Sequence, residues 1–175
     1  MHKYDINVND ITFTIFKDDS VWGDGKHEST KNILNLISKY GVKGKSVIDI
    51  GTGTGILSVL CGKLGASRIL ALDIDPNSLE WARKNFKRNN VDVEVEINDL
   101  TKCIDDKADV IVANLPGAVQ VDNLITVKNN LNDDGLFIMS WWNKLEFKDY
   151  VKGFEIMDHI PGDDYDVYVL KKYLK

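Results

Sequence analysis

The sequence contains 175 residues, of which 43% are hydrophobic and 28% charged, as is typical of a single globular domain. This composition excludes a disordered tail, a collagen-like repeat and a proline-rich linker protein. The net charge of -5 argues against a nucleic-acid partner, because proteins that bind phosphates more often carry excess positive charge.

The amino terminus, MHKYDINVND, lacks the apolar run of a signal peptide, and no stretch approaches the roughly 18 apolar residues that span a membrane. We therefore expect a cytoplasmic protein without a membrane partner. Cys61 and Cys103 do not have the spacing of a zinc site, so we predict two free thiols and no metal site. Residues 1–175 are expected to form one domain, with a hairpin, a loop and a helix in 1–40 and the sheet core in 41–175.

The amino-terminal third of the chain is predicted to hold a hairpin, a helix and the first core strand. Residues 4–16 (YDINVNDITFTIF) read as an extended hairpin, and Ser29 or Thr30 as the cap that opens a helix. The apolar run 45–50 predicts a strand that ends at a glycine cluster, and helical spacing begins at Ile56.

The next segment repeats the strand–helix pattern. Residues 68–74 (RILALDI) predict a second strand, after which Asp75-Pro76 caps and begins a helix, since proline has no N–H to lose at that position. Residues 91–97 (VDVEVEI) alternate with a period of two, which indicates a strand near a sheet edge with one face in water.

The carboxyl-terminal half continues the alternation and ends in two strands. Residues 108–114 are almost wholly apolar and predict a central parallel strand. The remaining elements are expected at 118–131 (helix, followed by an Asn-Asp-Asp-Gly turn), 135–142 (strand), 143–151 (short helix), 153–160 and 165–173 (strands). Only four residues separate the last two strands, so they should be antiparallel neighbours. The whole pattern predicts a doubly wound, mostly parallel α/β sheet.

The main chemical signal is the loop DIGTGTG, which follows the first core strand and precedes a helix. Its glycines, Gly51, Gly53 and Gly55, let the backbone turn tightly and approach a ligand without an intervening Cβ. Asp73 ends the second strand, at about the 20-residue offset of an acid that binds ribose hydroxyls. The pair indicates a cofactor that contains adenosine.

The residues around the loop favour one adenosine cofactor over another. The dinucleotide pattern G-x-G-x-x-G fails because Ile56 stands at the last position. A carboxylate at Asp49, two residues before the first glycine, gains nothing from a pyrophosphate but readily accepts an ammonium group. S-adenosylmethionine carries adenosine, a sulfonium and an ammonium without phosphate, so it fits better than NAD.

At this point the chain resembles the class I S-adenosylmethionine-dependent methyltransferases over about residues 45–140. The matching segments are DIGTGTG, ALDIDP, Asn98-Asp99 and VIVANLPG. The resemblance implies a Rossmann-like, seven-stranded sheet with an antiparallel carboxyl-terminal hairpin. It also implies cofactor contacts from the loop that begins at Asp49 and includes Thr52, a ribose site at Asp73, and adenine contacts from Ile74 and Asp99. Asn114 would lie between the methyl group and the acceptor.

Residues 21–30, VWGDGKHEST, are more closely similar to the A-F-G-T-G-x-H-x-T-T segment of the PrmA-type methyltransferases, which modify amino groups of a ribosomal protein. This resemblance implies that Trp22 and Thr30 line the cofactor pocket and that His27 shapes the loop. The sequence departs from that family in two ways: nothing here supplies its separate recognition domain, and Ser140-Trp141-Trp142 replaces a Ser-Gly pair and an aliphatic residue. Trp141 and Trp142 could box an amine by cation–π contact or lie buried under the next helix.

The expected reaction is an in-line methyl transfer to nitrogen. The Asn114 carbonyl could accept an N–H bond from the acceptor and aim the nitrogen lone pair at the methyl carbon. The sequence offers no clear general base: His27 is a candidate by type, and Asp24 and Glu28 beside it are interpreted as solvated.

Other functions remain open on the sequence alone. A protein amino group is the leading acceptor, and a small-molecule N- or O-methyltransferase is the first alternative. A non-catalytic adenosine-binding module and a nicotinamide oxidoreductase follow. The oligomeric state is not predicted.

Overall fold

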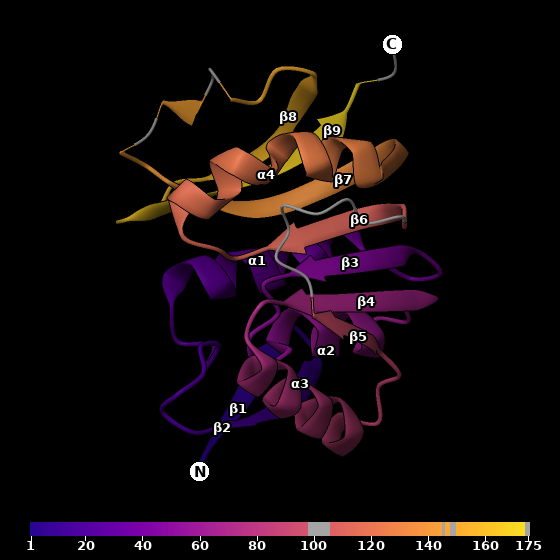
Figure 1. Cartoon of the computed structure of the whole chain (residues 1–175), viewed down its shortest axis with the longest axis vertical. Coiled ribbons are helices and arrows are strands. Elements are labelled where there is room, and N and C mark those ends of the chain that lie inside the picture. The colour runs from indigo at the N-terminus through magenta and orange to yellow at the C-terminus, as the bar shows by residue number, and fades with distance from the viewer. Residues whose placement is uncertain (98–105, 145, 148–149, 174–175) are drawn as a thin grey trace.

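The computed structural model describes residues 1–97, 106–144, 146–147 and 150–173. Its centre is a seven-stranded sheet with the strand order β5-β4-β3-β6-β7-β9-β8 (Figure 1). The strands are β3 (Ser46–Ile50), β4 (Arg68–Asp73), β5 (Glu94–Ile97), β6 (Ala108–Ala113), β7 (Leu131–Trp142), β8 (Phe154–Ile160) and β9 (Tyr165–Lys172). Strands β3 to β7 pair in parallel, whereas β9 runs antiparallel between β7 and β8.

Helices cover both faces of this sheet. One face carries α1 (Glu28–Tyr40), α2 (Ile56–Lys63) and α3 (Pro76–Asn89), together with the hairpin of β1 (His2–Val8) and β2 (Ile11–Lys17). The other face carries α4 (Gly117–Asn130), which lies over β7 in Figure 1. The predicted doubly wound α/β fold with an antiparallel end is confirmed. No helix in the described residues is long and apolar enough to cross a membrane.

Strand alternation divides the core into two clusters, one on each face. On β3, Val47 points into the cluster under α1 and α2, whereas Ile48 points into the cluster under α4. The central strand β6 repeats this with Val110 and Ile111, both buried. Because each face is covered, the central strands β3 and β6 are mostly apolar, as parallel strands in such sheets are, and Asp49 in β3 is a buried exception. The strand predicted at 45–50 is confirmed as β3, and the central parallel strand predicted at 108–114 is confirmed as β6.

The β1–β2 hairpin is attached to the core by two asparagines of α3. The Asn85 side chain accepts the Phe16 N–H at 2.8 Å and donates to the Phe16 carbonyl at 2.9 Å, as a neighbouring strand would. Asn89, one turn later, donates to the Thr14 carbonyl at 2.8 Å. Asn85 also donates to the carbonyl of Thr54 in the glycine loop at 2.9 Å. One fully buried side chain therefore connects the hairpin, α3 and the loop.

The helix starts were predicted with unequal success. Asp75 caps α3 as expected, because its carboxylate accepts the N–H groups of Asn77 and Ser78 and Pro76 takes the first helical position. The start predicted for α1 at Ser29 or Thr30 was wrong. The helix begins at Glu28, and the preceding residue, His27, makes no side-chain cap.

Two further predictions need correction. Among the described residues of 143–151, Phe147 is in a 3-10 conformation and the others lie in turns or irregular backbone, so these residues form no α-helix. The Asn-Asp-Asp-Gly turn is instead part of β7, which begins at Leu131 directly after α4. The register between β6 and β7 shifts there, and Asp134 has a φ of 62°, so the four residues form an irregularity within the strand.

Asn85→Ala should lower the free energy of unfolding by about 2–4 kcal/mol, since it leaves a buried N–H and two carbonyls without partners. Urea denaturation measures the change. Arg83→Ala, at an exposed site on the same helix, is the matched control and should change stability by about 0.5 kcal/mol or less. Equal effects of the two substitutions would show that the asparagine bonds do not hold the hairpin.

Candidate functional site

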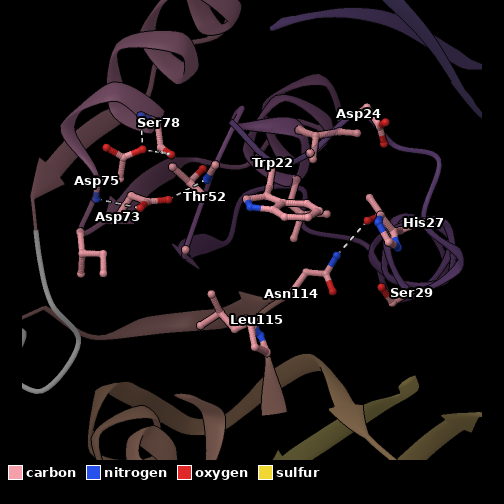
Figure 2. A pocket seen from close by; sticks show the side chains of 18 of the residues that line it. Trp22, Asp24, His27, Ser29, Thr52, Asp73, Asp75, Ser78, Asn114 and Leu115 are labelled. Carbon is pink, nitrogen blue, oxygen red and sulfur yellow. Dashed lines mark hydrogen bonds between the residues drawn. The ribbon is translucent and has the colours of Figure 1, made fainter. Parts of the chain in front are cut away.

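A cavity of about 670 Å³ opens at the carboxyl-terminal ends of β3, β4 and β6 (Figure 2). This is the edge where open α/β sheets bind ligands, next to the point where the chain reverses direction across the sheet between β3 and β6. The glycine loop, the segment before α1, the start of α3 and the residues after β6 form its wall. These lining residues are Ser20, Trp22, Gly23, Asp24, His27, Ser29, Thr30, Gly51, Thr52, Gly53, Ile56, Leu57, Asp73, Ile74, Asp75, Ser78, Asn114, Leu115, Pro116 and Tyr165.

The glycine loop is shaped by close backbone contacts. The N–H groups of Gly51 and Thr52 both donate to the Leu72 carbonyl of β4, at 2.8 and 2.9 Å, which turns the chain sharply after β3. Gly53 has a φ of +53°, and a Cβ there would lie 2.7 Å from the Trp22 carbonyl oxygen. A side chain at this position would therefore push away the segment that closes the cavity.

Gly55, predicted as a cofactor contact, does not line the cavity. It has a φ of +81°, and a Cβ there would lie 2.3 Å from Cε1 of Phe86 on α3. The loop therefore needs glycine at this position for close packing against α3.

The end of β4 provides a carboxylate and an exposed apolar side chain. Asp73 Oδ2 accepts the Gly53 N–H at 2.9 Å, and its Oδ1 accepts the Asp75 N–H at 3.0 Å. Each oxygen is thus fixed by one backbone bond and keeps a lone pair for a hydroxyl group. Ile74, beside it in the wall, is 64% exposed. The two side chains have the chemistry that a ribose and an adenine ring require.

Asp49, predicted to meet an ammonium group, lies below the loop and not in the cavity wall. It is fully buried, and the hydroxyls of Thr52 and Ser58 donate to its Oδ2 at 2.7 and 2.6 Å. Its Oδ1 has no hydrogen-bond partner among the described residues. Burial raises the pKa of Asp49 to about 6, despite the opposing effect of the two hydroxyls. A carboxylate in this state gains from any cation that binds nearby.

Thr54 holds the segment that carries Trp22 against the glycine loop. Its N–H donates to the Trp22 carbonyl at 3.1 Å and its hydroxyl to the Gly23 carbonyl at 2.7 Å. A third bond joins Asn77 of α3 to the Ser20 hydroxyl at 2.7 Å. The backbone of this wall is therefore fixed, while the Trp22 indole remains 80% exposed and lies 6.3 Å from the His27 ring.

Asn114 follows β6 and reaches across to α1. Its Nδ2 donates to the Thr30 hydroxyl at 2.8 Å, and both residues line the cavity (Figure 2). This bond uses one of the two N–H groups of Nδ2 and orients the side chain, whose acceptor atom is Oδ1. Since Ala113 pairs with Ile50, Asn114 lies beside Gly51 at the sheet edge.

The tryptophans at the end of β7 do not form the predicted amine box. Trp141 is 1% exposed and packs at 5.2 Å from Phe147 and 5.4 Å from Tyr150, in the cluster under α4. Trp142 is partly exposed, 5.6 Å from the Lys144 ammonium, and lies outside the cavity wall. Of the two alternatives for Trp141, an amine box or burial under the segment that follows, the structure shows burial. Asp99, predicted to contact adenine, lies outside the described residues.

The sequence interpretation missed several lining residues. Tyr165 begins β9 opposite Trp142, so an antiparallel last strand already implied that it reaches this edge. Ser29 was assigned only a capping role. Asp24 was interpreted as solvated, yet it is partly buried in the cavity wall.

The family model described as ribosomal protein L11 methyltransferase (PrmA) matches residues 20–160. A ribosomal protein L11 methyltransferase of Caldicellulosiruptor saccharolyticus is 40% identical over 149 residues, which cover 85% of this chain and 49% of that protein. The protein of the same name from Thermosipho africanus is 37% identical, with coverage of 86% and 57%. The chain thus spans about half the length of the curated relatives it matches.

Solved structures show the same fold. The ribosomal protein L11 methylase of Lactobacillus delbrueckii subsp. bulgaricus has a TM-score of 0.81 and 28% identity, over 87% of this chain and 81% of that one. A T. Thermophilus 16S rRNA N2 G1207 methyltransferase, solved with AdoMet and guanosine, has a TM-score of 0.83 and 19% identity, over 98% and 50%. At that identity the second likeness concerns the fold alone.

Gly55→Ala should lower the free energy of unfolding by about 3 kcal/mol, since it combines a strained φ with a clash against Phe86. Gly65→Ala is the matched control: φ there is +83°, but the nearest atom, Lys43 Cγ, is 3.6 Å from the added Cβ. It should cost about 1 kcal/mol from backbone strain alone. Thermal or urea unfolding of both variants measures the difference, and equal losses would refute the packing role of Gly55.

Proposed function

Because the chain belongs to the ribosomal protein L11 methyltransferase (PrmA) family, we propose that it transfers a methyl group from S-adenosylmethionine to an amino group of a protein. The observation that carries the proposal is one cavity that Asp73 and Asn114 both face, from the ends of β4 and β6. The first has the chemistry of a ribose site and the second that of an acceptor site. Because the chain covers only about half the length of each of these curated relatives, its activity and its acceptor are proposals.

The described residues of the cavity fit S-adenosylmethionine better than a dinucleotide. The wall includes three carboxylates, Asp24, Asp73 and Asp75, and its described part has no lysine or arginine that would favour a phosphate. The buried Asp49 carboxylate below the loop favours a cation. Asp73 would hold the ribose and Ile74 would pack on the adenine. When bound, the cofactor supplies a methyl group on a positively charged sulfur.

Asn114 would position the acceptor nitrogen. With its Nδ2 bonded to Thr30, its Oδ1 can accept one N–H of a neutral amine and direct the nitrogen lone pair. A displacement of this kind needs chiefly alignment at about 3–3.5 Å, which a fixed side chain supplies without acid–base chemistry. Thr30 acts through Asn114 and is a positioning residue.

The relatives are named ribosomal protein L11 methyltransferase, and we propose ribosomal protein L11 as the acceptor of this chain as well. This acceptor would place the reaction in the cytoplasm, where ribosomes work. A small-molecule acceptor is the alternative, and it is an outcome of the labelling experiment below.

The affinity for S-adenosylhomocysteine should fall about tenfold between pH 7 and pH 5, because Asp49 gains a proton below its pKa of about 6 and no longer attracts the ligand's ammonium. Titration calorimetry measures the affinity. Methylthioadenosine, which lacks the ammonium, should change less than about twofold. In Asp49→Asn the difference between the two ligands should disappear. A ligand affinity that does not change with pH would contradict the role of Asp49, and absence of binding to both would refute the cofactor.

Asn114→Ala should reduce methyl transfer to purified ribosomal protein L11 by about 100-fold or more, because the acceptor nitrogen loses its positioning group. Its affinity for S-adenosylhomocysteine should change less than about threefold. Transfer of a radiolabelled methyl group measures the rate, and Asn7→Ala in the distant hairpin is the control. Label that reaches only small molecules in a cell extract would reject a protein acceptor.

A further inference from the structure

The three carboxylates of the cavity wall differ in how many hydrogen bonds they accept. Asp73 is held by two backbone N–H groups, and Asp75 is occupied as the cap of α3, where it also accepts the Ser78 hydroxyl. Both carboxylates belong to the side of the cavity assigned to adenosine. Asp24, on the segment before α1, is the remaining carboxylate among the described lining residues.

The Asp24 carboxylate has no neutralising partner in the described part of the chain. Its Oδ1 accepts the Lys26 N–H at 2.9 Å, and none of the described residues forms an ion pair with it. The Lys26 ammonium lies 5.0 Å from the centroid of the Tyr4 ring. Asp24 is therefore a partly buried acidic residue of the cavity wall, with one carboxylate oxygen bonded to the backbone of its own loop.

Trp22 adds an aromatic surface on the same segment. Its carbonyl is fixed by Thr54, while the indole is 80% exposed and is not packed into the core. In Figure 2 the indole lies directly above Asn114, and Asp73 lies to its left beyond Thr52. An exposed indole and an acidic side chain that line one cavity from the same segment suit an alkylammonium or guanidinium group, which is attracted to both.

The reacting nitrogen cannot be the group that this surface holds. It must be neutral to use its lone pair, and a carboxylate beside an indole would stabilise its protonated form. The neutral amide of Asn114 is suited to the reacting nitrogen. A positive charge that persists through the reaction must come from another side chain of the acceptor.

We infer that Trp22 and Asp24 form a specificity subsite for a second cationic side chain of the protein acceptor, next to the amine that is methylated. The inference rests on the proposed function and names the sequence context that this site selects. It predicts an acceptor with adjacent basic residues. The carboxylates of the wall would repel a nucleic-acid backbone.

The test measures binding to protein saturated with S-adenosylhomocysteine, so it does not depend on turnover. The probes are the peptides acetyl-Ala-Lys-Lys-Ala-amide, acetyl-Ala-Lys-Gln-Ala-amide and acetyl-Ala-Gln-Lys-Ala-amide, with a uridine hexanucleotide as the anionic probe. The first peptide should bind at least about fivefold more tightly than the other two. A ratio of this size corresponds to the binding free energy of one charge-assisted or cation–π contact. The hexanucleotide should bind more weakly than any peptide.

Two substitutions locate the effect. Asp24→Asn and Trp22→Ala should each reduce the preference for two lysines to twofold or less, and Trp22→Phe should keep most of it. Asp10→Asn removes the same charge at the far tip of the hairpin, where the neighbouring Asn9 contacts Ser38 near the end of α1, and should leave the preference unchanged.

The outcomes separate the subsite from the proposed function. Equal binding of the three peptides, no detectable binding, tighter binding of the hexanucleotide, or equal behaviour of Asp24→Asn and Asp10→Asn would each overturn the subsite. Failure to bind S-adenosylhomocysteine would instead overturn the cofactor. Unchanged affinity for S-adenosylhomocysteine in Asp24→Asn shows that any loss of peptide binding is not a folding defect.

Discussion

The site depends on the hydrogen bonds of one buried threonine. Thr54, fully buried in the glycine loop, uses its N–H, its hydroxyl and its carbonyl to bind Trp22, Gly23 and Asn85. Through these bonds the loop after β3 fixes the segment before α1, and α3 fixes the loop. A buried polar group of this kind stabilises a structure only when all its partners are in place. The cavity wall is therefore built as one unit, although its parts are distant in sequence.

The parallel sheet is the second feature that brings the residues of the site together. Because the strands share one direction, the residues that follow β3, β4 and β6 meet at a single edge. Gly51, Asp73 and Asn114 are the residues at or just beyond those ends. The sheet needs mostly apolar residues on both of its faces, so apart from the buried Asp49 of β3 the polar side chains of the site lie at the strand ends and in the loops beyond them. The strongest functional signals in the sequence therefore directly follow its most apolar runs.

This arrangement explains what the sequence could predict. The glycine loop, the cap at Asp75 and the apolar strands are local patterns, and each was located from a few adjacent residues. Trp141 could not be assigned from its neighbours, because its burial depends on Phe147 and Tyr150, which reach it through turns. Asn85 gives no local signal either, since its partners lie in β2 and the glycine loop.

The two sides of the cavity differ in how firmly the fold constrains them. On the side proposed for adenosine, Asp73 and Gly53 are bonded to each other, so a change in either alters the turn that follows β3. On the side proposed for the acceptor, the segment of Trp22 and Asp24 is fixed by its backbone, and Tyr165 at the start of β9 lines the cavity. The side chains of Trp22, Asp24 and Tyr165 can change without disturbing the hydrogen bonds that shape the glycine loop. A fold built in this way can keep one cofactor while its acceptor changes, and it confines that freedom to side chains outside the parallel strands.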